Sequence, residues 1–252
     1  IMNENSAKPL AGIRVIEVGQ LLAGPWAGTM LGYFGAEVIK VEPPEVGDPI
    51  RKWREVKNGQ SLWWSSLARN KKCVTLDLKE ARGRELLGEL INKSDVVIEN
   101  FKPGTMEKWD LGPKNFETSN PGLIYARISG YGQTGPYAKK PGFASVCEGF
   151  GGFRYVNGFP GDAPVRPNLS MGDTLAGMHA AMGILLAYIN RECREGSGQV
   201  VDVSIFESIF NLMEAVVPEY SGAGIIREPS GSTLTGIVPS NTYRCGDNKL
   251  IV

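Results

Sequence analysis

Short apolar runs alternate with amphipathic segments over the first half of the chain. Residues 13–18, 38–41, 73–77, 95–99 and 123–128 are apolar runs that predict strands. Pro25 suits the first turn of a helix that extends to about Phe34, and the pattern over 81–92 predicts an amphipathic helix. Strands that alternate with helices indicate an α/β fold, here a Rossmann-like, mostly parallel sheet with helices on both faces.

The pattern changes after Pro136, where a glycine-rich region begins. Residues 173–190 predict a long apolar helix whose small side chains allow close packing, followed by a strand at 200–203 and a helix at 205–217. We expect a large α/β domain over 1–233 and the start of a smaller α+β domain over 234–252. The final apolar run resembles a strand cut short, so we expect the chain to be truncated.

Composition excludes several classes of protein. The 27 basic and 27 acidic residues balance, so no net charge attracts nucleic acid or an acidic membrane. No stretch approaches a membrane-spanning length, and the first residues contain no apolar signal region. The four cysteines are too far apart to suggest zinc, a redox pair or a disulfide framework. We therefore predict no metal, no nucleic-acid or membrane partner, and a cytoplasmic protein, or an organelle-matrix protein if eukaryotic.

Three loops follow predicted strands, at 19–25, 100–104 and 129–136. The carboxyl ends of parallel strands meet at one edge of a sheet, so these loops should converge there. The first loop lacks the G-x-G-x-x-G spacing, and the chain has no P-loop, which disfavours a nicotinamide cofactor.

Asp173 stands where a loop enters the long apolar helix. On local sequence alone, an acidic residue there fits a helix N-cap. His179, the only histidine, is expected to be structural, because one histidine cannot form a two-histidine zinc site and no nucleophile-elbow G-x-S-x-G motif is present.

Six motifs in register change the interpretation of Asp173. They are LAGP at 22–25, GAEVIKVE at 35–42, RNKK at 69–72, ENFKPG at 99–104, SGYGQTGP at 129–136 and GDTLAGMH at 172–179. In this order and spacing, from about Lys8 onward, the chain resembles the class III coenzyme A (CoA) transferases, the family of formyl-CoA and carnitine CoA-transferases.

The resemblance implies reversible transfer of CoA from an acyl-CoA to a carboxylic acid. Asp173 would be the nucleophile, passing through an aspartyl anhydride and an aspartyl-CoA thioester. The substrates would be the acyl-CoA and the acid, with no tightly bound cofactor, and two copies would form an interlocked homodimer. The residues expected to contact CoA are Leu22, Ala23, Arg69, Lys71, Leu76, Lys79, Asn100, Phe101, Lys102, Lys108 and Phe143.

Two positions depart from formyl-CoA transferases: Leu22 replaces a glutamine and Pro43 replaces an arginine. Other cations must then compensate for the lost arginine, and the leucine suggests a different acyl group. The family commonly uses dicarboxylates such as succinate or oxalate, and Arg127, Arg154 and Arg166 are candidates to neutralise a second carboxylate.

Two alternatives remain. Related acyl-CoA racemases use a histidine in a Gly-His-Asp motif, where this chain has Gly142, Phe143 and Ala144, so the racemase base is absent. The other alternative is a non-catalytic CoA-binding protein.

Overall fold

The computed structural model describes residues 8–194 and 196–252 and is built on a parallel six-stranded sheet. Its strands are β1 (Arg14–Glu17), β2 (Glu37–Glu42), β5 (Lys71–Thr75), β6 (Val96–Glu99), β7 (Ile124–Ser129) and β8 (Val200–Ser204). They lie in the order β5-β2-β1-β6-β7-β8, and every pair is parallel, which confirms the predicted α/β fold. From β1 the chain adds β2 and then β5 on one side of the sheet. It then returns to the other side of β1 and adds β6, β7 and β8. The crevice at such a reversal is where α/β sheets bind ligands.

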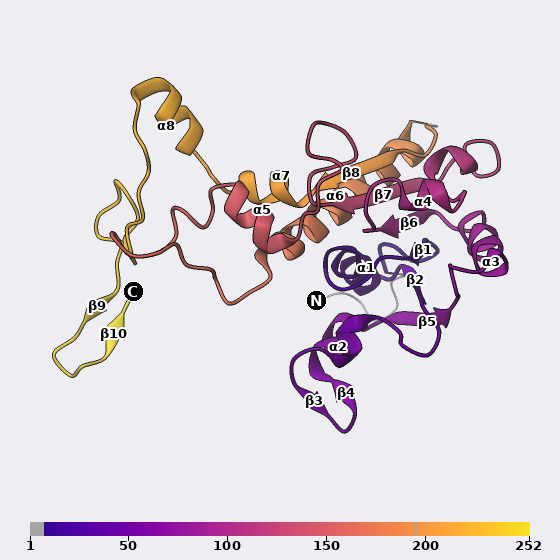
Figure 1. Ribbon diagram of the computed structural model, residues 1–252, viewed down its shortest axis with the longest axis horizontal. Helices are drawn as coiled ribbons and strands as arrows, with labels where there is room; N and C mark the ends of the chain where they lie inside the picture. Colours follow the sequence, from indigo (N-terminus) through magenta and orange to yellow (C-terminus); the bar gives the residue numbers. More distant parts are fainter. Residues whose placement is uncertain (1–7, 195) are drawn as a thin grey trace.

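Helices cover both faces of the sheet (Figure 1). On one face, α1 (Ala23–Tyr33) packs against the long α6 (Met171–Cys193), and their small residues share a core with Val15. On the other face, α3 (Ala81–Ile91) and α4 (Thr105–Lys108) share a core with Ile16. Adjacent residues of β1 therefore serve opposite cores, as the alternation of a strand requires.

The remaining elements are short. They are η1 (Pro49–Lys52), β3 (Val56–Lys57), β4 (Gln60–Ser61), α2 (Leu62–Leu67), η2 (Pro113–Phe116), α5 (Ala144–Phe150), α7 (Ile205–Phe210), α8 (Val216–Ala223), β9 (Tyr243–Arg244) and β10 (Leu250–Ile251). None of the helices described is long and apolar enough to cross a membrane.

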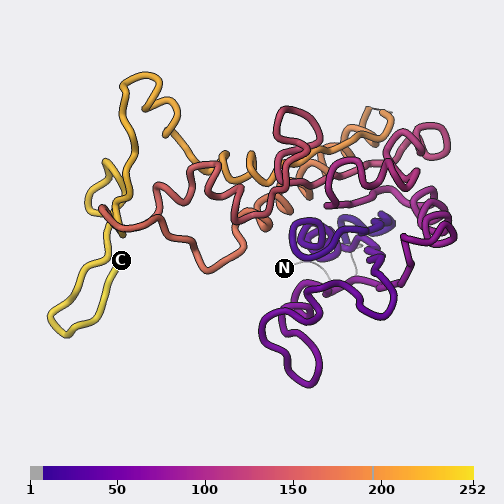
Figure 2. The backbone as a smooth tube through the Cα atoms, viewed as in Figure 1, coloured from indigo at the N-terminus to yellow at the C-terminus, as the bar shows by residue number. Residues whose placement is uncertain are grey.

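An arm formed by residues 216–252 extends away from the sheet and ends in the β9–β10 hairpin (Figure 2). A loop from earlier in the chain lies beside it: Gly231 N donates to Gly158 O at 2.8 Å, and Tyr155 Oη donates to Glu228. That residues 234–252 begin a second domain stays a prediction.

Element boundaries differ from the sequence predictions in two places. The helix expected over 205–217 is two helices, α7 and α8, because the chain turns between them and Glu214 adopts a left-handed φ of 45°. The strand expected at 73–77 lies two residues earlier, at Lys71–Thr75. It is an edge strand with mostly exposed side chains, and lysines are common on such edges, so the apolar pattern misplaced it.

Candidate active site

A cavity of about 670 Å³ lies at the carboxyl edge of the sheet and brings the three predicted loops together. Leu22 lines it from the first loop, Phe101 from the second and Gly130 from the third. The start of α5 and the first turn of α6 close the opposite wall. Of the residues selected from the sequence, the cavity is lined by Leu22, Asn100, Phe101, Lys102, Phe143 and Asp173.

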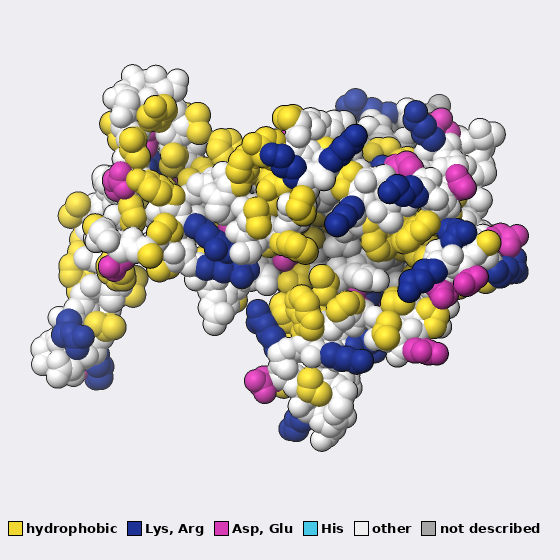
Figure 3. Space-filling view, in the orientation of Figure 1, with side chains coloured by type: hydrophobic (Ala, Val, Ile, Leu, Met, Phe, Trp, Pro, Cys, Tyr) yellow, Lys and Arg dark blue, Asp and Glu magenta, His cyan; other side chains and the backbone are white. Residues whose placement is uncertain are grey.

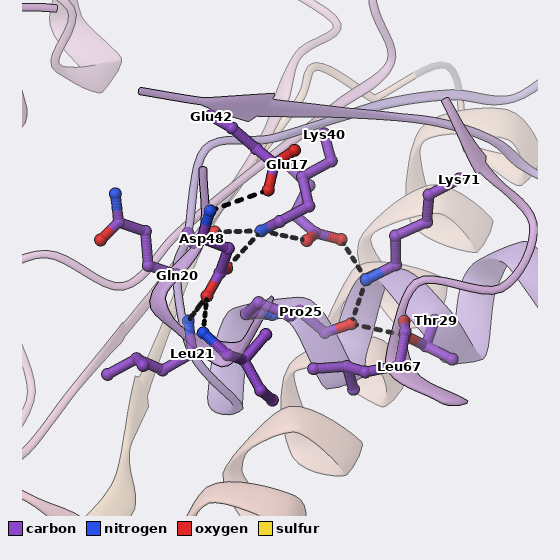
Figure 4. Close-up of polar contacts among 12 residues, drawn as sticks. Glu17, Gln20, Leu21, Pro25, Thr29, Lys40, Glu42, Asp48, Leu67 and Lys71 are labelled. Carbon is purple, nitrogen blue, oxygen red and sulfur yellow. Dashed lines mark hydrogen bonds and ion pairs between the residues drawn. The ribbon is translucent and has the colours of Figure 1, made fainter. Parts of the chain in front are cut away.

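Asn100 and Asp48 hold the first loop in place. The Asn100 side chain bonds both backbone groups of Gln20, accepting from its N–H and donating to its carbonyl, each at 2.8 Å. The Asp48 carboxylate accepts from Leu21 N at 3.2 Å (Figure 4). Leu21 has a left-handed φ of 64°, which costs free energy for a residue with a Cβ, so these bonds fix a conformation that the loop would not favour by itself. A Cβ at Gly19 would lie 2.7 Å from Asn100 Oδ1, so only glycine fits there.

A buried ionic network lies behind this loop. Lys40 Nζ lies 3.0 Å from Glu17 Oε1 and 2.8 Å from Asp48 Oδ2, and Lys71 Nζ lies 2.8 Å from Glu17 Oε2 (Figure 4). Lys71 also donates to Pro25 O at 2.7 Å. This corrects the expectation for Lys71: its side chain is 1% exposed and directed into the protein, so it supports the loop instead of meeting a ligand.

Asp173 is the third residue of α6, and Ser170 occupies the N-cap position. The N-cap interpretation is therefore wrong. Burial, followed by the charge of Glu148 and opposed by Arg166, raises the pKa of Asp173 to about 6. The position in the first turn of α6, which favours a negative charge, does not hold this pKa low, yet the carboxylate form still dominates at neutral pH.

Glu148 is a buried acid of α5 that sequence analysis did not select. Its side chain is 0% exposed, and it lies 3.2 Å from Arg154 NH2 and 3.3 Å from Arg166 Nε. Gly172 N, next to Asp173, donates to Glu148 Oε1 at 3.4 Å. A Cβ at Gly172 would lie 3.1 Å from that of Ala144, so glycine allows α5 and α6 to approach here. In the sequence, Glu148 could have been noticed as a single acidic residue in a glycine-rich, mostly apolar stretch.

The three candidate arginines have different surroundings. Arg127 is bound at 2.7 Å to Glu99 and also to Glu107, and it is absent from the cavity wall, so it is not available for a substrate carboxylate. Arg154 is held by Glu148 and Ser145. Of these three arginines, Arg166 is the one that lines the cavity.

Six residues expected to contact CoA lie outside the cavity lining. Ala23 is buried at the start of α1, and Arg69 stacks on Tyr33 with its guanidinium carbon 5.2 Å from the ring centre. Leu76 packs in the same cluster as Phe101, whereas Lys71, Lys79 and Lys108 are not part of the wall. His179 bonds Ser208 Oγ at 3.0 Å, which fits the structural role predicted for it.

Four charged or aromatic residues of the cavity lining were missed: Trp53, Arg54, Trp63 and Lys140. The Arg54 guanidinium carbon lies 3.9 Å from the centre of the Trp63 ring, and among the residues described Arg54 pairs with no carboxylate. The density of tryptophan and arginine between 51 and 64 was the available signal. No group of three acidic, histidine or cysteine side chains in the described chain is arranged to hold a metal.

Comparison with known proteins identifies the family. The model of CoA-transferase family III matches residues 10–252. The chain belongs to this family. The chain is 49% identical, over 99% of its length, to the succinyl-CoA–D-citramalate CoA-transferase of Chloroflexus aurantiacus, and 46% identical, over 96%, to a succinyl-CoA–L-malate CoA-transferase alpha subunit of the same organism.

The fold of this chain is also found in a solved structure. A CAIB/BAIF family protein from Brucella suis superposes with a TM-score of 0.89 at 34% identity, covering 96% of this chain and 65% of that one. The chain spans 62% and 57% of the two Chloroflexus proteins.

Proposed function

We propose that the protein transfers CoA reversibly from an acyl-CoA to a free carboxylic acid, with Asp173 as the nucleophile. The observation that carries this proposal is a carboxylate with a raised pKa on the wall of a cavity of about 670 Å³ in a CoA-transferase family chain. Both Chloroflexus relatives are named as transferases of CoA from succinyl-CoA to an acid, which supports the same reaction class here.

The reaction balances with the carboxylate alone. Asp173 attacks the thioester carbonyl, the C–S bond breaks, and an anhydride and CoA thiolate form. The thiolate attacks the aspartyl carbonyl and releases the first acid, leaving an enzyme-CoA thioester. The acceptor carboxylate attacks this thioester and regenerates an anhydride and the thiolate, which then attacks the acyl carbonyl. The product acyl-CoA leaves with Asp173 again ionised.

The substrates that we propose are dicarboxylic acids. The names of the relatives pair succinyl-CoA with citramalate or malate. Arg54 and Arg166 line the cavity. Arg166 pairs with Glu148, whereas Arg54 pairs with no carboxylate among the residues described, so the Arg54 guanidinium can pair with a carboxylate distant from the reacting one. The tryptophan under Arg54 gives this cation an apolar support.

We propose that CoA extends from the cavity across an apolar surface beside Phe101. Phe101 lines the cavity and meets Trp109 edge-on, with ring centres 5.3 Å apart. Leu76 packs against the same cluster. Lys79 and Lys108 are close in sequence to Leu76 and Trp109 of this surface. If the adenine ring of CoA packs on these apolar groups, the two lysines can pair with the CoA phosphates.

Replacing Lys79 or Lys108 by alanine is expected to raise the Michaelis constant for acyl-CoA several-fold with little change in turnover, since a remote phosphate contact acts equally in ground and transition states. The effect should shrink with a dephospho-CoA thioester if the contact is to the 3′-phosphate. Lys93→Ala is the control, because this exposed lysine lies just before β6, at the opposite edge of the sheet. Equal responses from all three variants would place the two lysines outside the CoA surface.

Withholding the acceptor tests the proposed function directly. Incubation with succinyl-CoA alone should release up to about one equivalent of acid per site and leave CoA bound to the peptide that contains Asp173. Hydroxylamine or borohydride should then trap the thioester carbonyl. A racemase would instead exchange the α-proton of its acyl-CoA with deuterated solvent. Exchange without an adduct would contradict the proposed transferase. If neither an adduct nor exchange is observed, a CoA-binding protein is favoured.

We also propose assembly with a second copy of the chain. Apolar side chains are exposed along the arm, including Tyr220, Ile226 and Leu250. Figure 3 shows hydrophobic side chains on the surface of this arm. A projecting arm cannot bury these groups by itself, and a second copy of the chain would cover them. The mass in solution tests this. We also propose a cytosolic location, because the four cysteines are free thiols and thiols stay reduced in the cytosol. Thiol titration of protein purified without reductant tests this proposal.

A further inference from the structure

Glu148 places an acidic side chain where the fold alone would not favour one. Its side chain is fully buried, and ionising a buried carboxylate is costly even when it is paired. A second acid, Asp173, lies nearby on α6, and two like charges oppose each other. A glutamine would accept the same bond from Gly172 N without either cost. The charge therefore calls for an explanation beyond packing.

Two arginines compensate this charge, and they place the cluster at the reacting group. Arg154 and Arg166 both meet Glu148 Oε2, and Arg166 reaches the cavity wall. Two cations and the two carboxylates of Glu148 and Asp173 give a net charge of zero when Asp173 is ionised. When Asp173 is acylated, the cluster becomes positive by one charge, at the moment when an anion, CoA thiolate or acid, is released.

We propose that Glu148 is a positioning residue for the Asp173 reaction: its buried carboxylate holds Arg166 at the cavity wall and places a fixed negative charge behind the nucleophile. This inference rests on the proposed function. Each attack by Asp173 moves its negative charge outward to the leaving group, and repulsion from Glu148 favours that movement. Arg166 is kept where the released anion carries the charge.

The other groups around Asp173 do not supply this effect. Cys147 on α5 stays a neutral thiol, because burial raises its pKa to about 11. Helix α1, which packs against α6, has no acidic or basic residue. The charged groups on the cavity wall besides Arg166 and Asp173 are Arg54, Lys102 and Lys140. Neighbouring elements also carry Tyr33 of α1, Tyr125 and Arg127 of β7, Asp202 of β8, Glu207 of α7, and His179, Tyr188, Arg191, Glu192 and Cys193 of α6. Of these, Arg127 is bound by Glu99 and Glu107, and His179 is bound to Ser208.

The test measures the rate of enzyme-CoA thioester formation from succinyl-CoA against pH, in single turnover without acceptor. Glu148→Gln should move the acid limb of the profile down by about one pH unit, because the pKa of Asp173 falls when its like-charged neighbour is removed. The rate at pH 8 should fall about threefold, since a carboxylate that is about one pKa unit less basic is a weaker nucleophile. The Michaelis constant for acyl-CoA and the melting temperature should be maintained.

Arg154→Gln should move the same limb in the opposite direction, to higher pH, since the charge of Glu148 is then less compensated. Glu207→Gln is the matched control: this exposed acid lies in the first turn of α7 and should leave the limb unchanged. An unmoved acid limb in Glu148→Gln would overturn the inference, whether or not the rate falls. If Asp173→Ala is inactive while Glu148→Gln keeps the wild-type limb, only this inference fails; if Asp173→Ala still turns over, the proposed function fails.

Discussion

Replacing Asp173 by alanine is expected to abolish CoA transfer, with a loss of at least about a thousandfold in turnover, because no covalent intermediate can then form. The fold should be maintained, since Asp173 is not the N-cap of α6 and its side chain accepts no cap bond there. Binding of CoA should also persist, because the proposed CoA surface is formed by other residues. Steady-state rates with succinyl-CoA and malate measure the loss of turnover, and calorimetry measures the binding of CoA. Substantial residual turnover would remove Asp173 from the mechanism.

Asp173→Asn adds a stability test to this prediction. The native state raises the pKa of Asp173 to about 6, so it disfavours the carboxylate form. Below about pH 4 the group is protonated in both the folded and the unfolded state, and the cost is absent; above about pH 6 it is fully present. The asparagine variant avoids this cost. Its melting temperature relative to the wild type should therefore rise more at pH 8 than at pH 4. A larger gain at pH 4 would contradict the raised pKa.

Glu17→Gln is expected to be the most destabilising of these substitutions, lowering the free energy of unfolding by about 3–5 kcal/mol. Glu17 is bound to both Lys40, at 3.0 Å, and Lys71, at 2.8 Å. Without its charge, Lys40 pairs with Asp48 alone, and the buried ammonium of Lys71 has no carboxylate partner among the residues described. Denaturant unfolding at neutral pH measures the loss.

An exposed pair of the same chemistry provides the control for Glu17. Lys72 Nζ bonds Glu37 Oε1, but the Lys72 side chain is 72% exposed. Lys72→Ala should therefore cost less than about 1 kcal/mol, because solvent screens the pair. Similar losses in Glu17→Gln and Lys72→Ala would contradict the structural role assigned to the buried network.

Much of the fold could be predicted from the sequence, because local patterns carry the information. Apolar runs placed β1, β2, β6, β7 and β8 within two residues of their bounds, and the periodicity over 81–92 matches α3. The prediction for 205–217 was wrong because a turn at Asn211–Ala215 interrupts an otherwise continuous apolar pattern. The edge strand β5 was misplaced for a related reason, since an exposed strand has no apolar run to mark its start.

The sequence by itself determined the α/β class, the family and the convergence of three loops at one edge of the sheet, since strand patterns and motif spacing are properties of the chain order. Only the tertiary structure decided which charges face the cavity. Lys71 and Arg127 are bound inside by Glu17 and by Glu99 and Glu107, whereas Arg54 and Arg166 reach the wall. It also decided that Glu148 lies beside Asp173, 25 positions away along the chain. Burial and ion pairing depend on which segments meet in space, so they cannot be predicted from the residue type alone.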